Sequence, residues 1–94
     1  LQVNGDSMNK VLPSGSMIVI ERLHSNSYKW HPKDIVLIRH GSEYTLKRVR
    51  KTDKEVVLEP ESFYDGFLTQ RFNLEDVEDM ELIGRVALTY SYFV

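Results

Sequence analysis

Five short blocks rich in β-branched and aromatic residues dominate the sequence, and short polar links separate several of them. The blocks are SMIVIERL (16–23), DIVLIRH (34–40), EYTLKRVRK (43–51), KEVVLEP (54–60) and ELIGRVALTYSYFV (81–94). Residues of these types favour strands. The links HGSE (40–43) and KTDKE (51–55) are typical of tight hairpins. The sequence therefore predicts a mainly β fold of coiled antiparallel sheets with at most short helical turns.

The rest of the chain is polar or turn-rich. The stretch 24–33 is expected to form an exposed loop, and the acidic run 73–81 a solvated loop or edge. The residues after Asp6 predict one short helical turn that ends at Pro13 and Gly15. The 94 residues, with no internal repeat, are expected to form a single domain over 1–94.

Composition narrows the classes of function. A net charge of −2 and a pI near 5.9 give no electrostatic footprint for nucleic acid, so this chain by itself is not expected to bind DNA. The absence of cysteine excludes disulfides and thiolate metal sites and suits a reducing cytoplasm. No apolar run approaches the length of a membrane helix. Because the chain opens at Leu1 without an initiator Met, we expect it to be a fragment of a longer protein.

Ser7, in the stretch VNGDSMNKVLPSG (3–15), allows two interpretations. Asp6 or Ser7 can be the N-cap of the short turn, since both residue types accept hydrogen bonds from free N–H groups at a helix start. Alternatively, Ser7 is a nucleophile beside backbone N–H donors that stabilise an oxyanion, provided that a base activates it. The spacing of the residues leaves both interpretations open.

The available bases are histidines and lysines. His24, His31 and His40 fall in polar loops or at a hairpin, and we expect them to be solvated surface residues without a partner acid. Lys47 lies in the block YTLKRVR, where strand alternation places it on one face with Thr45 and Val49. The pattern does not decide which face is inward. Burial of that face would lower the pKa of Lys47 and make it a base.

Ser7 also belongs to a second sequence motif. Ser7 and Lys10 spell S-x-x-K, an arrangement found in β-lactamases and penicillin-binding proteins. Those enzymes also need S-D-N and K-T-G elements, and neither tripeptide occurs here. We therefore interpret this match as chance. The acidic residues of 75–81 likewise lack the spacing of a calcium loop, so no metal or cofactor is expected.

The motifs VNGDSM, LPSGSMIVIE, KDIVLI, YTLKRV, VVLEPES and LIGRV occur in this order along the chain. Together they resemble the C-terminal domain of LexA-like self-cleaving repressors, a family that includes LexA, UmuD and phage repressors. The resemblance runs from Val3 to about Val86. The chain departs from the family at Gly15-Ser16, where Gly-Asp is common, and it contains no upstream Ala-Gly or Cys-Gly bond.

The resemblance implies the LexA/signal-peptidase-like fold and a Ser-Lys dyad, with Ser7 as the nucleophile and Lys47 as the general base. The backbone N–H groups of Asp6 and Ser7 would then form the oxyanion site. Since a carboxylate facing Lys47 would keep the lysine charged, we expect Asp6 to point away and cap the following turn. Family members cleave a bond between a small residue and glycine, in the segment that joins this domain to an N-terminal DNA-binding domain.

The resemblance also implies partners in the cytoplasm. They are a second copy in a homodimer, a RecA filament or an antirepressor, and operator DNA through an N-terminal domain outside this chain, with no membrane. The segment ALTYSYFV (87–94) is either an exposed dimer edge or part of the core. Two other functions remain open. One is a dimerisation and antirepressor-docking module with little or no cleavage, and the other is a signal-peptidase-like enzyme.

Overall fold

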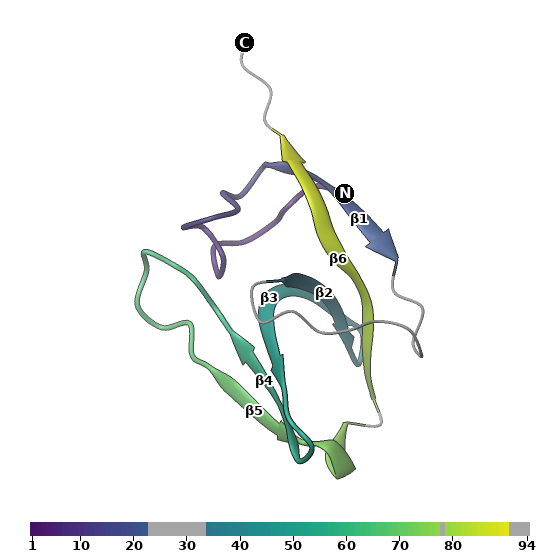
Figure 1. Cartoon of the computed structure of the whole chain (residues 1–94). Helices are drawn as coiled ribbons and strands as arrows, with labels where there is room; N and C mark the ends of the chain where they lie inside the picture. Colours follow the sequence, from purple (N-terminus) through teal and green to yellow (C-terminus); the bar gives the residue numbers. More distant parts are fainter. Residues whose placement is uncertain (23–33, 78, 91–94) are drawn as a thin grey trace.

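A computed structural model describes residues 1–22, 34–77 and 79–90 of the chain, and six strands account for most of them (Figure 1). The strands are β1 (Met17–Arg22), β2 (Ile35–His40), β3 (Glu43–Lys51), β4 (Glu55–Glu59), β5 (Gln70–Asn73) and β6 (Met80–Tyr90). One short 3-10 helix, η1 (Leu74–Asp76), precedes β6. The predicted mainly β, antiparallel fold is confirmed.

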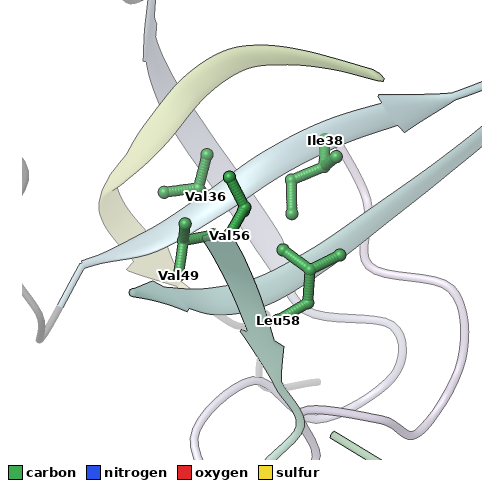
Figure 2. Close-up of a cluster of buried hydrophobic side chains, with 5 residues drawn as sticks. All are labelled: Val36, Ile38, Val49, Val56 and Leu58. Atoms are coloured by element: carbon green, nitrogen blue, oxygen red, sulfur yellow. The ribbon is translucent and has the colours of Figure 1, made fainter. Parts of the chain in front are cut away.

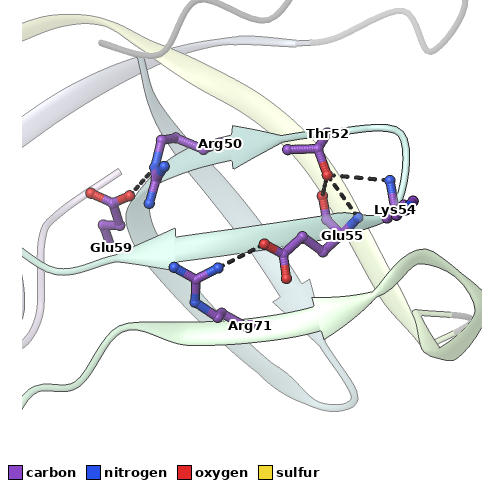
Figure 3. A network of polar contacts seen from close by, with 6 residues as sticks. All are labelled: Arg50, Thr52, Lys54, Glu55, Glu59 and Arg71. Carbon is purple, nitrogen blue, oxygen red and sulfur yellow. Dashed lines mark hydrogen bonds and ion pairs between the residues drawn. The ribbon is translucent and has the colours of Figure 1, made fainter.

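The strands form one antiparallel sheet in the order β1-β6-β2-β3-β4-β5. Both predicted hairpins are present. His40 pairs with Glu43 across the β2–β3 turn, and Lys51 pairs with Val56 across the β3–β4 turn. In the second turn the Thr52 hydroxyl accepts hydrogen bonds from the backbone N–H groups of two following residues (Figure 3). This contact closes the turn locally, as threonine often does.

Ion pairs connect the neighbouring strands β3, β4 and β5 on an exposed surface (Figure 3). Arg50 of β3 pairs with Glu59 of β4, and Arg71 of β5 pairs with Glu55 of β4. Exposed pairs of this kind contribute only about 0–1 kcal/mol each to stability. The sheet is therefore stabilised mainly by its apolar clusters.

Two segments differ from expectation, and two others fall outside the described residues. β5 was not predicted, because QRFN has a single apolar residue and hence no readable alternation. The acidic run 73–81, expected to be a solvated loop or edge, contains the last residue of β5, η1 and the first two residues of β6. The loop predicted at 24–33, with His24 and His31, lies outside the described residues, as do 91–94.

β6 lies between β1 and β2 in the order of the sheet, but beyond Arg85 it pairs only with β1 among the described strands. The two interpretations of 87–94, a dimer edge and part of the core, both stay predictions. β6 pairs with β2 from Met80 to Arg85 and with β1 from Gly84 to Tyr90. Its register shifts once against each neighbour, and such bulges increase the twist and coiling of a strand.

Gly84 lies in β6 where Ile20 and the backbone of Glu21 in β1 come close to its Cα. A Cβ at this position would lie 2.4 Å from Ile20 Cγ2 and 2.6 Å from the Glu21 carbonyl oxygen. Real Cβ atoms do not approach backbone this closely, so the pairing of β1 with β6 requires glycine at this point. This close approach explains why the LIGRV motif has glycine at this position.

Two apolar clusters fill the coiled sheet. The first lies between β2, β3 and β4, where five buried side chains point toward one another (Figure 2). They are Val36, Ile38, Val49, Val56 and Leu58. The second cluster joins the N-terminal segment to the sheet and is built from Val3, Met8, Leu12 and Ile18. Burying side chains of this size contributes roughly 1.5–3 kcal/mol each. The second cluster therefore anchors the segment that carries Ser7.

Candidate functional site

Ser7 lies in a turn of the N-terminal segment, which is fixed from both sides. Gly5, at φ 105°, reverses the chain just before Ser7 in a conformation that favours glycine. Its N–H donates to Ser14 Oγ at 3.2 Å. After Ser7, Met8 is buried in the second cluster, and its carbonyl accepts from the Leu12 N–H at 2.7 Å. The predicted single helical turn is therefore formed.

Lys47 lies in the middle of β3, directly opposite Val36 of β2. Only 8% of its surface is exposed, and Val49, two residues along, is also buried. The structure thus answers the question that alternation left open: the face of Thr45, Lys47 and Val49 is the inward one. A lysine in this position has lost most of its water.

The side chains of Ser7 and Lys47 are in direct contact. Lys47 Nζ lies 2.7 Å from Ser7 Oγ, 2.6 Å from Thr45 Oγ1 and 3.2 Å from the Leu46 carbonyl oxygen. A charged ammonium has three N–H donors, whereas a neutral amine has two donors and one lone pair. When the amine is neutral, it can donate to Thr45 and Leu46 and accept the Ser7 hydroxyl proton.

Burial lowers the pKa of Lys47 below its ordinary value of 10.5. Desolvation acts alone here, because none of the ion pairs of the described residues includes Lys47. A nearby carboxylate would have raised the pKa instead. Burial therefore disfavours the charged ammonium relative to a lysine in water, which is the direction that a general base requires.

Asp6 behaves only partly as expected. No ion pair joins its carboxylate to Lys47, but the predicted side-chain cap is wrong. Within the described residues its carboxylate accepts no hydrogen bond, and its carbonyl closes the turn by accepting from the Asn9 N–H at 3.2 Å. The backbone N–H groups of Asp6 and Ser7 donate no hydrogen bond within the same part of the chain. Both donors are therefore without a protein acceptor in the part of the chain that the structure describes.

Two contacts of the pair were not predicted. Thr45 was placed on the face of Lys47 by alternation, but its hydroxyl as an acceptor for the amine was not foreseen. The i, i+2 spacing of two polar residues on an apolar strand face was the available signal. The Glu61 N–H, which donates to the Ser7 carbonyl at 2.8 Å, gave no signal, because any non-proline residue carries that donor.

A cleft of about 360 Å³ opens beside Ser7. Apolar side chains supply much of its lining, among them Val3, Met8, Leu37 and Leu46. A cleft of this size with much apolar lining is typical of ligand-binding pockets, and Ser7 is one of its lining residues.

Other candidate chemistry lies apart from the pair. His40, expected to be a surface residue, is exposed, and its ring packs edge-on against Phe72 at 5.3 Å. No three His, Asp or Glu side chains of the described residues gather into a metal site. Among the same residues, no helix has the length and apolar character needed to cross a membrane.

Comparisons with known proteins give one family. A family model described as Peptidase S24-like matches residues 1–87, which include both Ser7 and Lys47. A search of curated proteins finds no match to the chain.

Proposed function

The chain belongs to the Peptidase S24-like family, and on this premise we propose that Ser7 and Lys47 are the catalytic pair of a serine peptidase. This membership confirms the resemblance to the C-terminal domains of LexA-like repressors that the ordered motifs indicated. The observation that supports the catalytic role most strongly is the 2.7 Å contact between Ser7 Oγ and a buried Lys47 Nζ.

The proposed reaction begins when neutral Lys47 takes the Ser7 hydroxyl proton and Ser7 Oγ attacks the carbonyl carbon of a peptide bond. The N–H groups of Asp6 and Ser7 stabilise the oxyanion that forms. Lys47 then gives its proton to the departing amine, and an ester to Ser7 remains. Water hydrolyses the ester, with Lys47 again accepting a proton, and the free hydroxyl is restored.

We propose that the substrate is a bond in the same polypeptide, upstream of this domain. Holding the substrate in the same chain replaces affinity with proximity, so a slow pair of catalytic residues suffices. In a cytoplasmic repressor, such cleavage would separate this domain from an N-terminal domain bound to operator DNA and end repression. A RecA filament or an antirepressor is the proposed stimulus.

A docking module with little or no cleavage is the competing proposal. That function makes no demand on Ser7 and Lys47, and an exposed, separated pair would support it. The observed contact favours chemistry instead, because it places a hydroxyl within hydrogen-bond distance of a buried amine, which is the geometry that a nucleophile and its general base require.

The rate of the Ser7 reaction is expected to rise with pH. Since burial places the Lys47 pKa below 10.5, the neutral base accumulates as pH rises, and the rate levels off above that lowered pKa. The measurement is the rate at which a fluorophosphonate labels Ser7 between pH 6 and 10, with the site identified by mass spectrometry. A flat profile over this range would contradict Lys47 as the base.

We also propose that the domain forms a homodimer through the exposed end of the β1–β6 pair. Val19 and Leu88 lie opposite each other in register and are 47% and 58% exposed. Leu88→Glu is expected to weaken the dimer about ten-fold or more, because it places a charge in an apolar contact. Sedimentation equilibrium measures the change, and Leu68→Glu, at an exposed leucine between β4 and β5, is the matched control. A wild-type chain that stays monomeric at high concentration would contradict the proposal.

A further inference from the structure

Residues Glu61 to Phe63, here called the strap, run along the turn that carries Ser7. The Glu61 N–H donates to the Ser7 carbonyl at 2.8 Å, and the Glu61 carbonyl accepts from the Lys10 N–H at 3.1 Å. The Phe63 N–H donates to Asn9 Oδ1 at 2.7 Å. Three hydrogen bonds thus join the strap to residues 7–10, although more than fifty positions separate the two segments in sequence.

The strap is also bonded to the strand of the lysine. The Glu61 carboxylate accepts a hydrogen bond from Arg48 Nε, and Arg48 directly follows Lys47 in β3. One residue therefore contacts the Ser7 turn through its backbone and the Lys47 strand through its side chain.

Lys10 has a contact of its own with the strap. Its ammonium lies 5.7 Å from the centroid of the Phe63 ring, in position for a cation–π interaction. The lysine of the S-x-x-K match is thus associated with the strap, while the amine on Ser7 comes from β3.

We propose that the strap is a positioning element for the peptidase reaction, an inference that rests on the proposed function. It holds the Ser7 turn against β3 so that Ser7 Oγ stays within hydrogen-bond distance of Lys47 Nζ. The turn is outside the sheet, so sheet hydrogen bonds do not fix it. The strap fixes the carbonyl of the same residue whose hydroxyl reacts. Misplacement of a reacting group by about 1 Å can cost up to roughly 100-fold in rate.

The test labels Ser7 of the whole chain with a fluorophosphonate. The Ser7 Oγ–P bond forms, fluoride leaves, and Lys47 takes the hydroxyl proton. Asn9→Ala removes the acceptor for the Phe63 N–H, and Glu61→Ala removes the link to Arg48. Each is expected to lower the labelling rate about ten-fold. Asn9→Asp keeps an acceptor oxygen and is expected to stay within about two-fold of wild type.

Glu59→Ala is the matched control for Glu61→Ala. Glu59 also pairs with an arginine of β3, Arg50, but the described contacts do not join it to the Ser7 turn. The control is expected to label at the wild-type rate even if it lowers the melting temperature as much as Glu61→Ala does. Equal losses of labelling in both variants would assign the effect to general stability and overturn the proposal.

A second measurement follows the contact between Ser7 and Lys47 without any chemical reaction. The Lys47 pKa, read from the ¹³Cε chemical shift, is expected to rise toward 10.5 in Asn9→Ala, because a displaced turn lets water reach the amine. An unchanged Lys47 pKa would overturn the strap proposal. Wild-type labelling rates in both Asn9→Ala and Glu61→Ala would overturn it as well. The proposed function fails by a different result, which is a wild-type chain that is not labelled at Ser7 or is labelled equally fast after Lys47→Met.

Discussion

Ser7→Ala is expected to abolish cleavage and fluorophosphonate labelling, with a loss of roughly a thousand-fold or more in rate. The substitution removes the single oxygen atom that would form the acyl or phosphonyl bond, and the Lys47 amine cannot replace it in the same geometry. The measurement combines the labelling rate of this chain with self-cleavage of a longer polypeptide that carries an upstream segment, both at alkaline pH.

The fold is expected to survive Ser7→Ala, because the Ser7 side chain belongs to neither apolar cluster. Ser42→Ala, at an exposed position in the β2–β3 hairpin, is the matched control and should keep the full wild-type rate. Cleavage that persists in Ser7→Ala at the wild-type rate would remove Ser7 from the nucleophile's role.

Lys47→Met is expected to have an equally large effect on rate. Methionine has nearly the same length and fits the buried position, but it has no lone-pair nitrogen to accept the hydroxyl proton. The rate should fall by roughly a thousand-fold, and the rise with pH should disappear together with it. Lys51→Met, on the same strand at an exposed position, is the control and should leave both the rate and the pH profile unchanged.

The same variant has a second consequence, for stability. In the folded chain the pKa of Lys47 is lower than in the unfolded chain, where it is near 10.5. Between these two values the unfolded state binds more protons, so the free energy of unfolding of the wild type rises with pH through that window. Lys47→Met should lose this rise.

Urea unfolding of both proteins between pH 7 and 10 tests the effect. As pH increases, the free energy of unfolding of the wild type should rise relative to that of Lys47→Met. Parallel pH curves for the two proteins would show that Lys47 titrates alike in the folded and unfolded chains.

The parts of the fold that follow from short-range patterns were predictable. Four predicted blocks match β1, β2, β3 and β4 closely, because β-branched residues in short runs carry a strong strand signal. The inward face of β3 was not predictable, since leucine on one face and valine on the other gave no preference. Packing of Val49 against β2 and β4 decided it, and that packing depends on tertiary contacts.

The candidate pair was predictable only in part. Local sequence around Ser7 favours a helix cap over a nucleophile, and it was the order of the motifs that connected Ser7 to Lys47. The strap was invisible in the sequence, because two of its three hydrogen bonds to the Ser7 turn join backbone groups that any sequence supplies. Contacts of this kind carry no side-chain signature, so only the three-dimensional arrangement reveals them.

The position of β6 in the sheet has a consequence for the time at which β1 can dock. Among the described strands β1 pairs only with β6, and the Gln2–Met17 bridge joins β1 to the segment that carries Ser7. β6 is the last strand in the described sequence, so a ribosome must synthesise it before β1 can dock. Before β6 is made, the nascent chain therefore carries the Ser7 segment next to a β1 that has no partner strand. Synthesis order thereby delays the docking of β1, and the packing of Val86 against the second apolar cluster, until β6 has been made.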